Sequence, residues 1–246
     1  MPEWRMMKKN VIVLTYGLSG SSVLTGLLVR GGYWPGAKTY VKPDYDTFEN
    51  VQLIELNKQL FAATNFSGNY ENNYSPETLQ AIAELRHKVD PASFRQFIAE
   101  CDRHRPWIWK DPRLWLTIRY WADLLDLESI HFLLLTRTPL QSWISYNLRR
   151  QVQSFGYAQR YCRQIETAIK QFLDERGLER HEILFDDLIV RPEATLERLN
   201  AFLGTQLTPA DLQAVYNQPL HRAPRSTLDL VKAALIYARN YGERQH

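Results

Sequence analysis

The chain has 246 residues, a formal net charge of +3, 45% hydrophobic residues and 23% charged residues. These proportions are typical of a globular protein with one sizeable core. The weak positive charge suits an anionic ligand but is too small to predict a nucleic-acid partner. The two cysteines, Cys101 and Cys162, lie far apart, so neither a disulfide framework nor a cysteine-rich zinc site is predicted.

The sequence has no run of about 18 apolar residues and no hydrophobic signal segment within its polar first stretch, residues 1–10. We therefore expect a soluble, cytoplasmic protein with no membrane partner. No repeat, low-complexity tract or linker interrupts the chain, which predicts a single domain over residues 1–246.

The first predicted elements are a buried strand over Asn10–Thr15 and a helix over Ser21–Arg30, joined by a loop of small residues. Glycines let a backbone approach a ligand closely, and a helix N-terminus presents unpaired N–H groups. The segment therefore predicts a cradle for a phosphate or sulfate, formed by Gly17, Leu18, Ser19, Gly20, Ser21 and Ser22. It lacks the lysine and the glycine spacing of a nucleoside-triphosphate P-loop. An ordinary strand-to-helix turn is the alternative interpretation.

The next part of the chain predicts mainly helices and loops. We expect a loop over residues 31–47, a helix over 48–63, an irregular loop over 65–75, and helices over 76–88 and 91–103. A short strand over 107–109 then ends at Lys110, and a helix follows over 114–125.

The most continuous apolar run, residues 129–136, predicts a buried parallel strand. Helices are expected over 139–150, 157–175 and 192–203, with a further strand over 182–185. Strands that alternate with helices predict a three-layer α/β fold, in which helices cover both faces of a central parallel sheet.

A second candidate anion site follows the strand over 129–136. Arg137 stands where this strand ends, on the usual ligand side of an open α/β sheet, and Ser145 follows eight residues later. Arginine offers a rigid fork to a phosphate, and a serine hydroxyl can complete the contact. Alternatively, Arg137 pairs with a carboxylate and Ser145 is part of the helix surface.

Together these two segments resemble sulfotransferases that use 3′-phosphoadenosine 5′-phosphosulfate (PAPS). Members carry a basic-Ser-Gly-Thr-Thr/Ser loop after the first strand, and an Arg-x-Pro segment with a serine eight residues after the arginine. The matching residues here are Ser19, Gly20, Ser21, Ser22, Arg137, Pro139 and Ser145. The resemblance implies a P-loop-NTPase-like fold, PAPS as sulfuryl donor, and a hydroxyl or amine of a small molecule or carbohydrate as acceptor.

Further matches extend the resemblance to residues 11–225. Phe48-Glu49-Asn50 resembles a segment of bacterial members, and Lys110-Asp111-Pro112 resembles the lysine-containing turn at a central strand end. His221 and Arg222 fall where many members have a basic element near the donor. The resemblance thus implies that Lys110 offsets the charge that develops during transfer, and that His221 and Arg222 contact the donor.

One position departs from the family pattern. The basic residue that normally precedes Ser19 is Leu18 here, and the loss of that cation should cost several kcal/mol of transition-state stabilisation unless another group replaces it. Lys110 and Arg113 are the nearest candidates by motif position.

The acceptor also needs a base, and Glu49 is the closest equivalent of the glutamate that one branch of the family uses. Glu49 as a favourable charge in the first turn of its helix is the alternative. Asp111 is the other candidate carboxylate, and the alternative is that it only fixes the turn before Pro112.

These observations favour sulfuryl transfer by in-line displacement without a metal. Two alternatives remain at this point. The first is a sulfotransferase-like protein that binds PAPS without catalysis, which the apolar Leu18 suggests. The second is a nucleoside kinase with a degenerate P-loop, which is disfavoured because the strand ends in Arg137 rather than a metal-binding acid, although Asp111 can serve.

Overall fold

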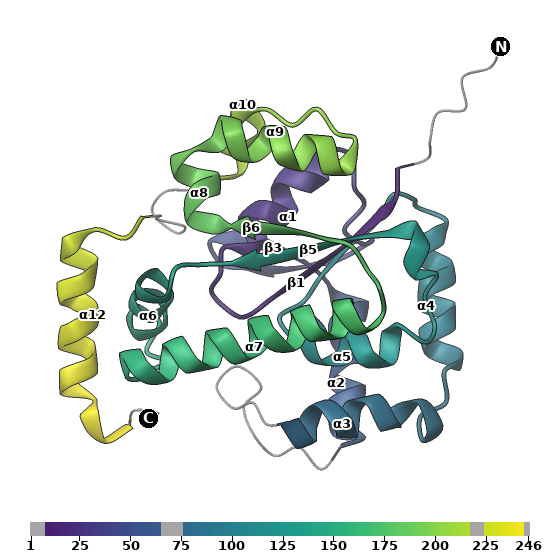
Figure 1. Cartoon of the computed structure of the whole chain (residues 1–246), viewed down its shortest axis with the longest axis horizontal. Helices are drawn as coiled ribbons and strands as arrows, with labels where there is room; N and C mark the ends of the chain where they lie inside the picture. The colour runs from purple at the N-terminus through teal and green to yellow at the C-terminus, as the bar shows by residue number, and fades with distance from the viewer. Residues whose placement is uncertain (1–7, 65–75, 217–223, 244–246) are drawn as a thin grey trace.

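The computed structural model describes residues 8–64, 76–216 and 224–243. A parallel sheet of four strands lies at its centre (Figure 1), formed by β1 (Asn10–Thr15), β4 (Ile108–Lys110), β5 (Ile130–Thr136) and β6 (Arg180–Leu184). The strand order is β4-β1-β5-β6, so the chain leaves β1 for a neighbour on one side and later returns to the other side. Ligands of open α/β sheets bind at such a reversal, beyond the carboxyl ends of the strands.

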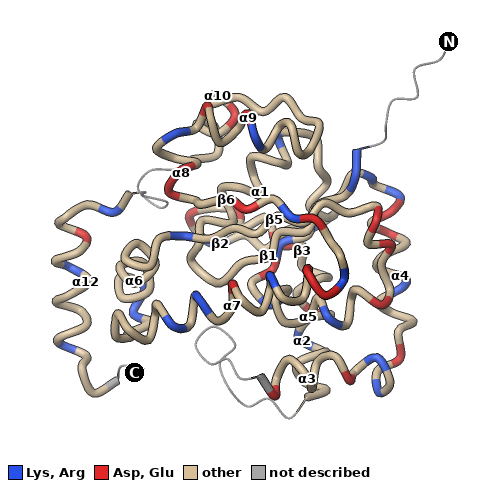
Figure 2. The backbone as a smooth tube through the Cα atoms, in the orientation of Figure 1, with Lys and Arg blue, Asp and Glu red and all other residues tan. Residues whose placement is uncertain are grey.

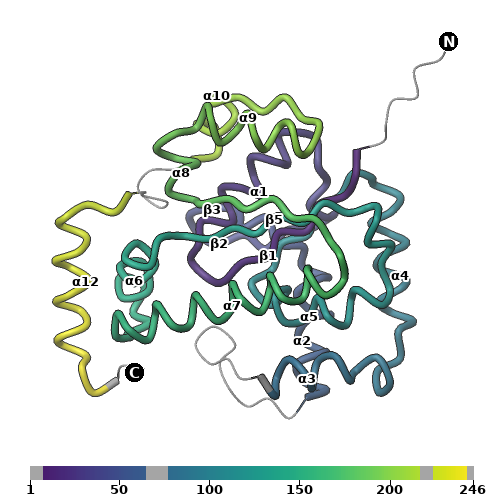
Figure 3. Tube along the Cα trace, in the orientation of Figure 1, coloured from purple at the N-terminus to yellow at the C-terminus, as the bar shows by residue number. Residues whose placement is uncertain are grey.

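Helices cover both faces of this sheet (Figure 1), which confirms the predicted three-layer fold. On one face lie α1 (Ser21–Arg30), α8 (Phe185–Val190), α9 (Pro192–Leu203) and α10 (Pro209–Val215). The other face is covered mainly by α2 (Val51–Ala62), α3 (Pro76–Glu84), α4 (Ala92–Asp102), α5 (Leu114–Trp121), α6 (Pro139–Leu148) and α7 (Phe155–Glu175). The last helix, α12 (Thr227–Arg239), packs beside α6 (Figure 3).

Alternate residues of the strands fill the two halves of the core. In β1, Val11 and Val13 face the layer of α1 and α9, whereas Ile12 and Leu14 face the layer of α5 and α7. All four side chains are fully buried. This explains why the strand reads as a continuous apolar run, since each face of the sheet needs its own apolar set.

The structure corrects the prediction for residues 31–63. A hairpin of β2 (Thr39–Lys42) and β3 (Tyr45–Asn50) occupies part of the expected loop, and α2 begins at Val51 rather than at residue 48. Asn50 is the N-cap of α2, and its side chain accepts hydrogen bonds from the backbone N–H groups of Gln52 and Leu53. Glu49 therefore lies on strand β3 of the hairpin, just before the N-cap of α2.

Charges of both signs occur along elements such as α4 and α12 (Figure 2). Among the described residues, none of the helices is long and apolar enough to cross a bilayer.

Candidate active site

A cleft of about 260 Å³ opens at the carboxyl ends of all four parallel strands. Each strand contributes at least one lining residue, either at its end or in the loop that follows. The lining residues that matter below are Gly17, Leu18, Gly20, Ser21, Ser22, Lys42, Tyr45, Thr47, Glu49, Lys110, Arg137, Ser145, Arg149, Phe185 and Arg225. The cleft thus brings together the predicted residues after β1, β4 and β5.

The loop after β1 presents backbone N–H groups to this cleft. Gly20 is the N-cap of α1, and no acidic residue lies in the first turn of that helix. In the described part of the chain, no group accepts a hydrogen bond from the backbone N–H of Gly20, Ser21 or Ser22. Unpaired N–H groups at a helix N-terminus attract an anion through their dipoles, so the loop has the chemistry of an anion cradle.

Gly20 is required by both its conformation and its neighbour. Its φ angle is 91°, and a Cβ atom there would lie 2.5 Å from the ring of Phe185. We expect Gly20→Ala to lower the free energy of unfolding by about 2–4 kcal/mol, because a left-handed conformation and a steric clash are combined. Urea unfolding measures this effect.

Gly177→Ala is the matched control for that variant. Gly177 also has a positive φ of 63°, but a Cβ atom there would meet nothing within 4 Å. It should therefore cost only about 1–2 kcal/mol. Equal losses for the two variants would contradict the proposed contact with Phe185.

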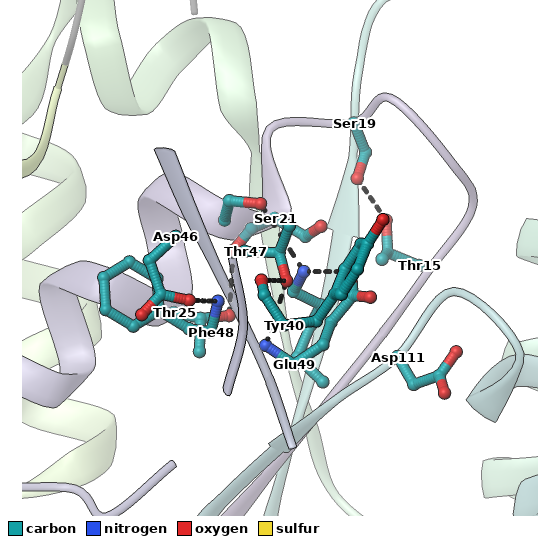
Figure 4. A network of polar contacts seen from close by, with 12 residues as sticks. Thr15, Ser19, Ser21, Thr25, Tyr40, Asp46, Thr47, Phe48, Glu49 and Asp111 are labelled. Atoms are coloured by element: carbon teal, nitrogen blue, oxygen red, sulfur yellow. Dashed lines mark hydrogen bonds and ion pairs between the residues drawn. The ribbon is translucent and has the colours of Figure 1, made fainter. Parts of the chain in front are cut away.

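Ser19 lies beneath the loop rather than along the cleft. Its side chain is fully buried, and its hydroxyl hydrogen-bonds with that of Thr15 at 2.6 Å (Figure 4). Thr15 Oγ1 also lies 2.7 Å from the carbonyl oxygen of Leu135 and donates to it, which ties the loop to β5. The structure therefore places Ser19 as a support of the loop, whereas Ser21 and Ser22 line the cleft.

Arg137 and Ser145 lie together, at the end of β5 and in the second turn of α6. Arg137 Nη1 donates to Ser145 Oγ at 3.0 Å, and its Nε lies 3.6 Å from Asp186 Oδ1. Burial lowers the pKa of the Arg137 guanidinium, and the nearby Asp186 carboxylate opposes this effect. Since an arginine stays charged in proteins, this side of the cleft holds a largely buried cation.

A second arginine, which the sequence analysis missed, completes this cluster. Arg225 lines the cleft, and its Nε donates to Ser145 Oγ at 3.4 Å, while its backbone N–H donates to Gln141. The predicted His221 and Arg222 lie outside the described residues. The sequence signal for Arg225 was only its basic character close to the predicted pair, because its position depends on how α12 packs against α6.

Lys110, Glu49 and Ser22 form the third cluster of the cleft. Lys110 Nζ donates to Glu49 Oε1 at 2.7 Å and lies 3.5 Å from Ser22 Oγ. The Lys110 side chain is 1% exposed and that of Glu49 is 14% exposed. The ammonium group is therefore held between the hairpin and the N-terminus of α1, where the anion cradle lies.

Glu49 is not part of a helix. It belongs to β3 and precedes the N-cap of α2, and its carboxylate pairs with Lys110. The interpretation of Glu49 as a favourable charge in the first helical turn is therefore wrong. Its side chain lies beside the loop after β1 and within reach of the cleft.

Asp111 is fully buried and holds the turn after β4 in place through hydrogen bonds. One carboxylate oxygen accepts from the backbone N–H and the Nη1 of Arg113, and the other accepts from Asn57 Nδ2 at 3.1 Å. Burial raises the pKa of this carboxyl, and the Arg113 charge opposes that effect. Neither Asp111 nor Arg113 lines the cleft, whereas Lys110 and the apolar Pro112 do, so Lys110 is the charged residue of this turn that reaches it.

The hairpin, which the sequence analysis did not predict, forms one wall of the cleft. Tyr45, Thr47 and Glu49 of β3 all line the cleft, together with Lys42 of β2. The Thr47 hydroxyl donates to the Tyr40 carbonyl oxygen across the hairpin (Figure 4). The available signal was the Pro43-Asp44 pair, a common turn sequence, between residues that favour strands.

The charge of the described cleft is strongly positive. Five cationic side chains line it, namely Lys42, Lys110, Arg137, Arg149 and Arg225, and Glu49 is the carboxylate among the lining residues. Within the described ranges, no three His, Cys, Asp or Glu side chains gather as they would around a metal ion. The cleft is thus suited to a ligand with several negative charges.

Comparison with known proteins supports the fold and identifies the family. A model of the sulfotransferase family matches residues 11–209. The sulfotransferase domain from the curacin biosynthetic pathway is 19% identical with a TM-score of 0.52, and the match covers 86% of this chain and 78% of that one. The sulfotransferase domain from the Synechococcus PCC 7002 olefin synthase is 18% identical with a TM-score of 0.52, covering 96% and 97% of the two chains. A search of curated proteins gives no significant match.

The family match spans the segments from which the cleft is built. It includes the loop after β1, Glu49, Lys110 and the Arg137–Ser145 pair, and it ends at the start of α10. The similarity to the two solved domains extends over most of the chain and shows a common fold. This chain belongs to the sulfotransferase family.

Proposed function

We propose that the protein transfers the sulfuryl group of PAPS to a hydroxyl or amine of a small-molecule or carbohydrate acceptor. The observation that carries this proposal is the presence of two separate anion sites in one cleft. The first is the N-terminus of α1 with Lys110, and the second is Arg137 with Ser145 and Arg225. PAPS carries a phosphosulfate and a separate phosphate, so its charges match both sites.

The donor would be held by residues that are already in place. The N–H groups of Gly20, Ser21 and Ser22 suit the 5′-phosphosulfate, and Arg137, Ser145 and Arg225 suit the 3′-phosphate. The hydroxyl of Ser145 accepts from both arginines, so the two guanidinium groups lie together at the proposed 3′-phosphate site.

For transfer, the oxygen of the acceptor hydroxyl forms a bond to sulfur, and Glu49 takes the proton of that hydroxyl. The bond between sulfur and the bridging oxygen breaks, and its electron pair stays on the departing 5′-phosphate. Lys110 stabilises the negative charge that grows on that bridging oxygen. The contact between Lys110 and Glu49 supports this assignment, since it holds the base and the cation together beside the cradle.

Leu18 remains the departure from the family pattern, and Lys110 is the better replacement for the missing cation. Leu18 has a left-handed φ of 60° and packs against the core, so it only offers apolar surface to the cleft. Arg113 is engaged with Asp111 and lies off the cleft. A binding protein without catalysis is the second candidate, and Leu18 is the observation that favours it.

The kinase alternative loses its support. It relied on Asp111 as a metal ligand, but both oxygens of that buried carboxylate accept hydrogen bonds from Arg113 and Asn57. Calorimetric titration with 3′-phosphoadenosine 5′-phosphate (PAP) and, separately, with ATP plus Mg²⁺ distinguishes the ligand classes. Tight PAP binding with no ATP binding is expected, and turnover of labelled PAPS with an acceptor panel then separates an enzyme from a binder.

We expect Arg137→Ala to weaken PAP binding by about 2–4 kcal/mol, because a buried charge-assisted contact with the 3′-phosphate is lost. Adenosine 5′-phosphosulfate, which lacks that phosphate, should be affected far less. Titration calorimetry with both ligands measures the difference. An equal loss for the two ligands would place Arg137 away from the 3′-phosphate.

A further inference from the structure

The cleft holds more cations than the donor uses. Under the proposed function, Lys110, Arg137 and Arg225 face the charges of PAPS, which leaves Lys42 and Arg149. Neither of these two side chains has a carboxylate within ion-pair distance in the described part of the chain. Lys42 contacts the ring of Tyr45, with Nζ 5.6 Å from the ring centroid.

Lys42 lies on the same face of the hairpin as the proposed base. Lys42 is paired directly with Tyr45 across the antiparallel hairpin, and directly opposed residues share a face. Tyr45, Thr47 and Glu49 alternate along β3 and all line the cleft. The wall therefore presents a carboxylate at one end and an ammonium group at the other.

The spacing of these two charges sets a length for the acceptor. Tyr45 and Glu49 are four residues apart, so their Cα atoms are separated by at most about 14 Å. A molecule whose hydroxyl meets Glu49 would thus reach Lys42 with a group on the order of 10 Å away. Arg149 is less suitable, because it follows Ser145 by one helical turn, on the side of the 3′-phosphate.

The hairpin is braced, so Lys42 starts from a fixed backbone. The Thr39 hydroxyl donates to Asp46 Oδ2 at 2.7 Å, and the Thr47 hydroxyl donates to the Tyr40 carbonyl oxygen at 2.6 Å (Figure 4). The ring of Phe48 packs closely on Gly26 of α1. A Cβ atom at position 26 would lie only 2.6 Å from that ring. A cation on such a wall is positioned before its ligand arrives, which reduces the cost of ordering it.

We propose that the acceptor is an anion, with a carboxylate, sulfate or phosphate that binds Lys42 while its hydroxyl, on the order of 10 Å away, meets Glu49. This inference rests on the proposed function, since it assumes that the acceptor approaches Glu49. It explains why Lys42, which has no carboxylate partner among the described residues, lies on the acceptor wall of a cleft that already contains three donor-facing cations.

Sulfuryl transfer to paired model acceptors tests this proposal. The probes are ω-hydroxyalkanoates of increasing chain length, each beside the uncharged ω-hydroxyalkanamide of the same length. The kcat/KM ratio of acid to amide should be about tenfold or more, which corresponds to about 1.4 kcal/mol, and should peak when hydroxyl and carboxylate are on the order of 10 Å apart. Lys42→Gln should reduce that ratio to about one, and Lys42→Glu should invert it.

Lys38→Gln is the matched control, because Lys38 is an exposed lysine of the same segment that does not line the cleft. It should keep the acid-to-amide ratio. An equal loss of kcat/KM for acid and amide in Lys42→Gln, with the ratio unchanged, would overturn the proposal and assign Lys42 to the donor. The proposal would also be overturned if Arg149→Gln, and not Lys42→Gln, reduced the acid-to-amide ratio of kcat/KM to about one.

A binding measurement keeps the proposal separate from catalysis. Calorimetry of the PAP-saturated protein with an alkanoate and the matching alkanamide, both without hydroxyl, should show tighter binding of the acid, and Lys42→Gln should remove that preference. Absence of turnover with every acceptor, with the binding preference intact, would reject the transferase and keep the anion site. No preference in the wild type would reject the anion site whatever the turnover.

Discussion

Lys110→Ala is expected to lower kcat by on the order of 10²-fold or more, with a smaller effect on PAP affinity. The reason is that Lys110 lies beside the N-terminus of α1, with Nζ 3.5 Å from Ser22 Oγ, and that the apolar side chain of Leu18 carries no charge there. Its charge is needed most when negative charge builds on the leaving oxygen. Steady-state turnover of labelled PAPS gives kcat, and calorimetry with PAP gives the affinity.

Two further variants separate the loss of charge from a loss of packing. Lys110→Met keeps most of the side-chain volume at this buried position and should lose as much activity as Lys110→Ala. Lys170→Ala removes a cation that pairs with Glu166 and Glu182 on the surface, and it should leave kcat unchanged. Full activity in Lys110→Met would show that Lys110 does not stabilise the transition state.

The sequence predicts the central sheet well because burial dominates there. The first strand and α1 match the predicted bounds, and each of the other sheet strands lies within a few residues of its predicted range. Strands that are covered on both faces read as continuous apolar runs, so this signal is local and strong. Alternation of such runs with amphipathic helices then leaves few topologies.

The hairpin and the last helix were missed for different reasons. β2 and β3 are short, half-exposed strands whose pattern is polar, and β3 packs against α1, β4 and α2. By contrast, α12 had a usable signal, because Ser226 and Asp229 form a capping box that is visible in the sequence. The same motif, Thr208 with Asp211, begins α10. Both α10 and α12 thus begin with a motif that the sequence displays, whereas the hairpin depends on tertiary contacts.

The site follows the same division between local and distant contacts. Arg137 and Ser145 are close because a strand end and the second turn of the following helix are adjacent, which their spacing predicts. Asp186 reaches the same cluster from the first turn of α8, and Arg225 reaches it from the segment before α12. No local pattern indicates contacts over such separations, so only the folded chain reveals them.

Glu49→Gln is expected to reduce kcat by about 10²–10⁴-fold, because an amide cannot take the proton of the acceptor. The cost in stability should be about 1–3 kcal/mol, because the buried Lys110 ammonium loses its counter-charge but keeps a hydrogen-bond acceptor. Steady-state kinetics and urea unfolding measure these effects.

PAP affinity distinguishes a lost base from a damaged site. Removal of the negative charge frees Lys110 to face the donor, so Glu49→Gln should bind PAP as tightly as the wild type or more tightly. Glu55→Gln is the control, since Glu55 pairs with Lys58 on the exposed side of α2 and should change neither kcat nor PAP affinity. Weaker PAP binding in Glu49→Gln would mean that Glu49 mainly holds Lys110 in place. A kcat close to that of the wild type would exclude Glu49 as the base.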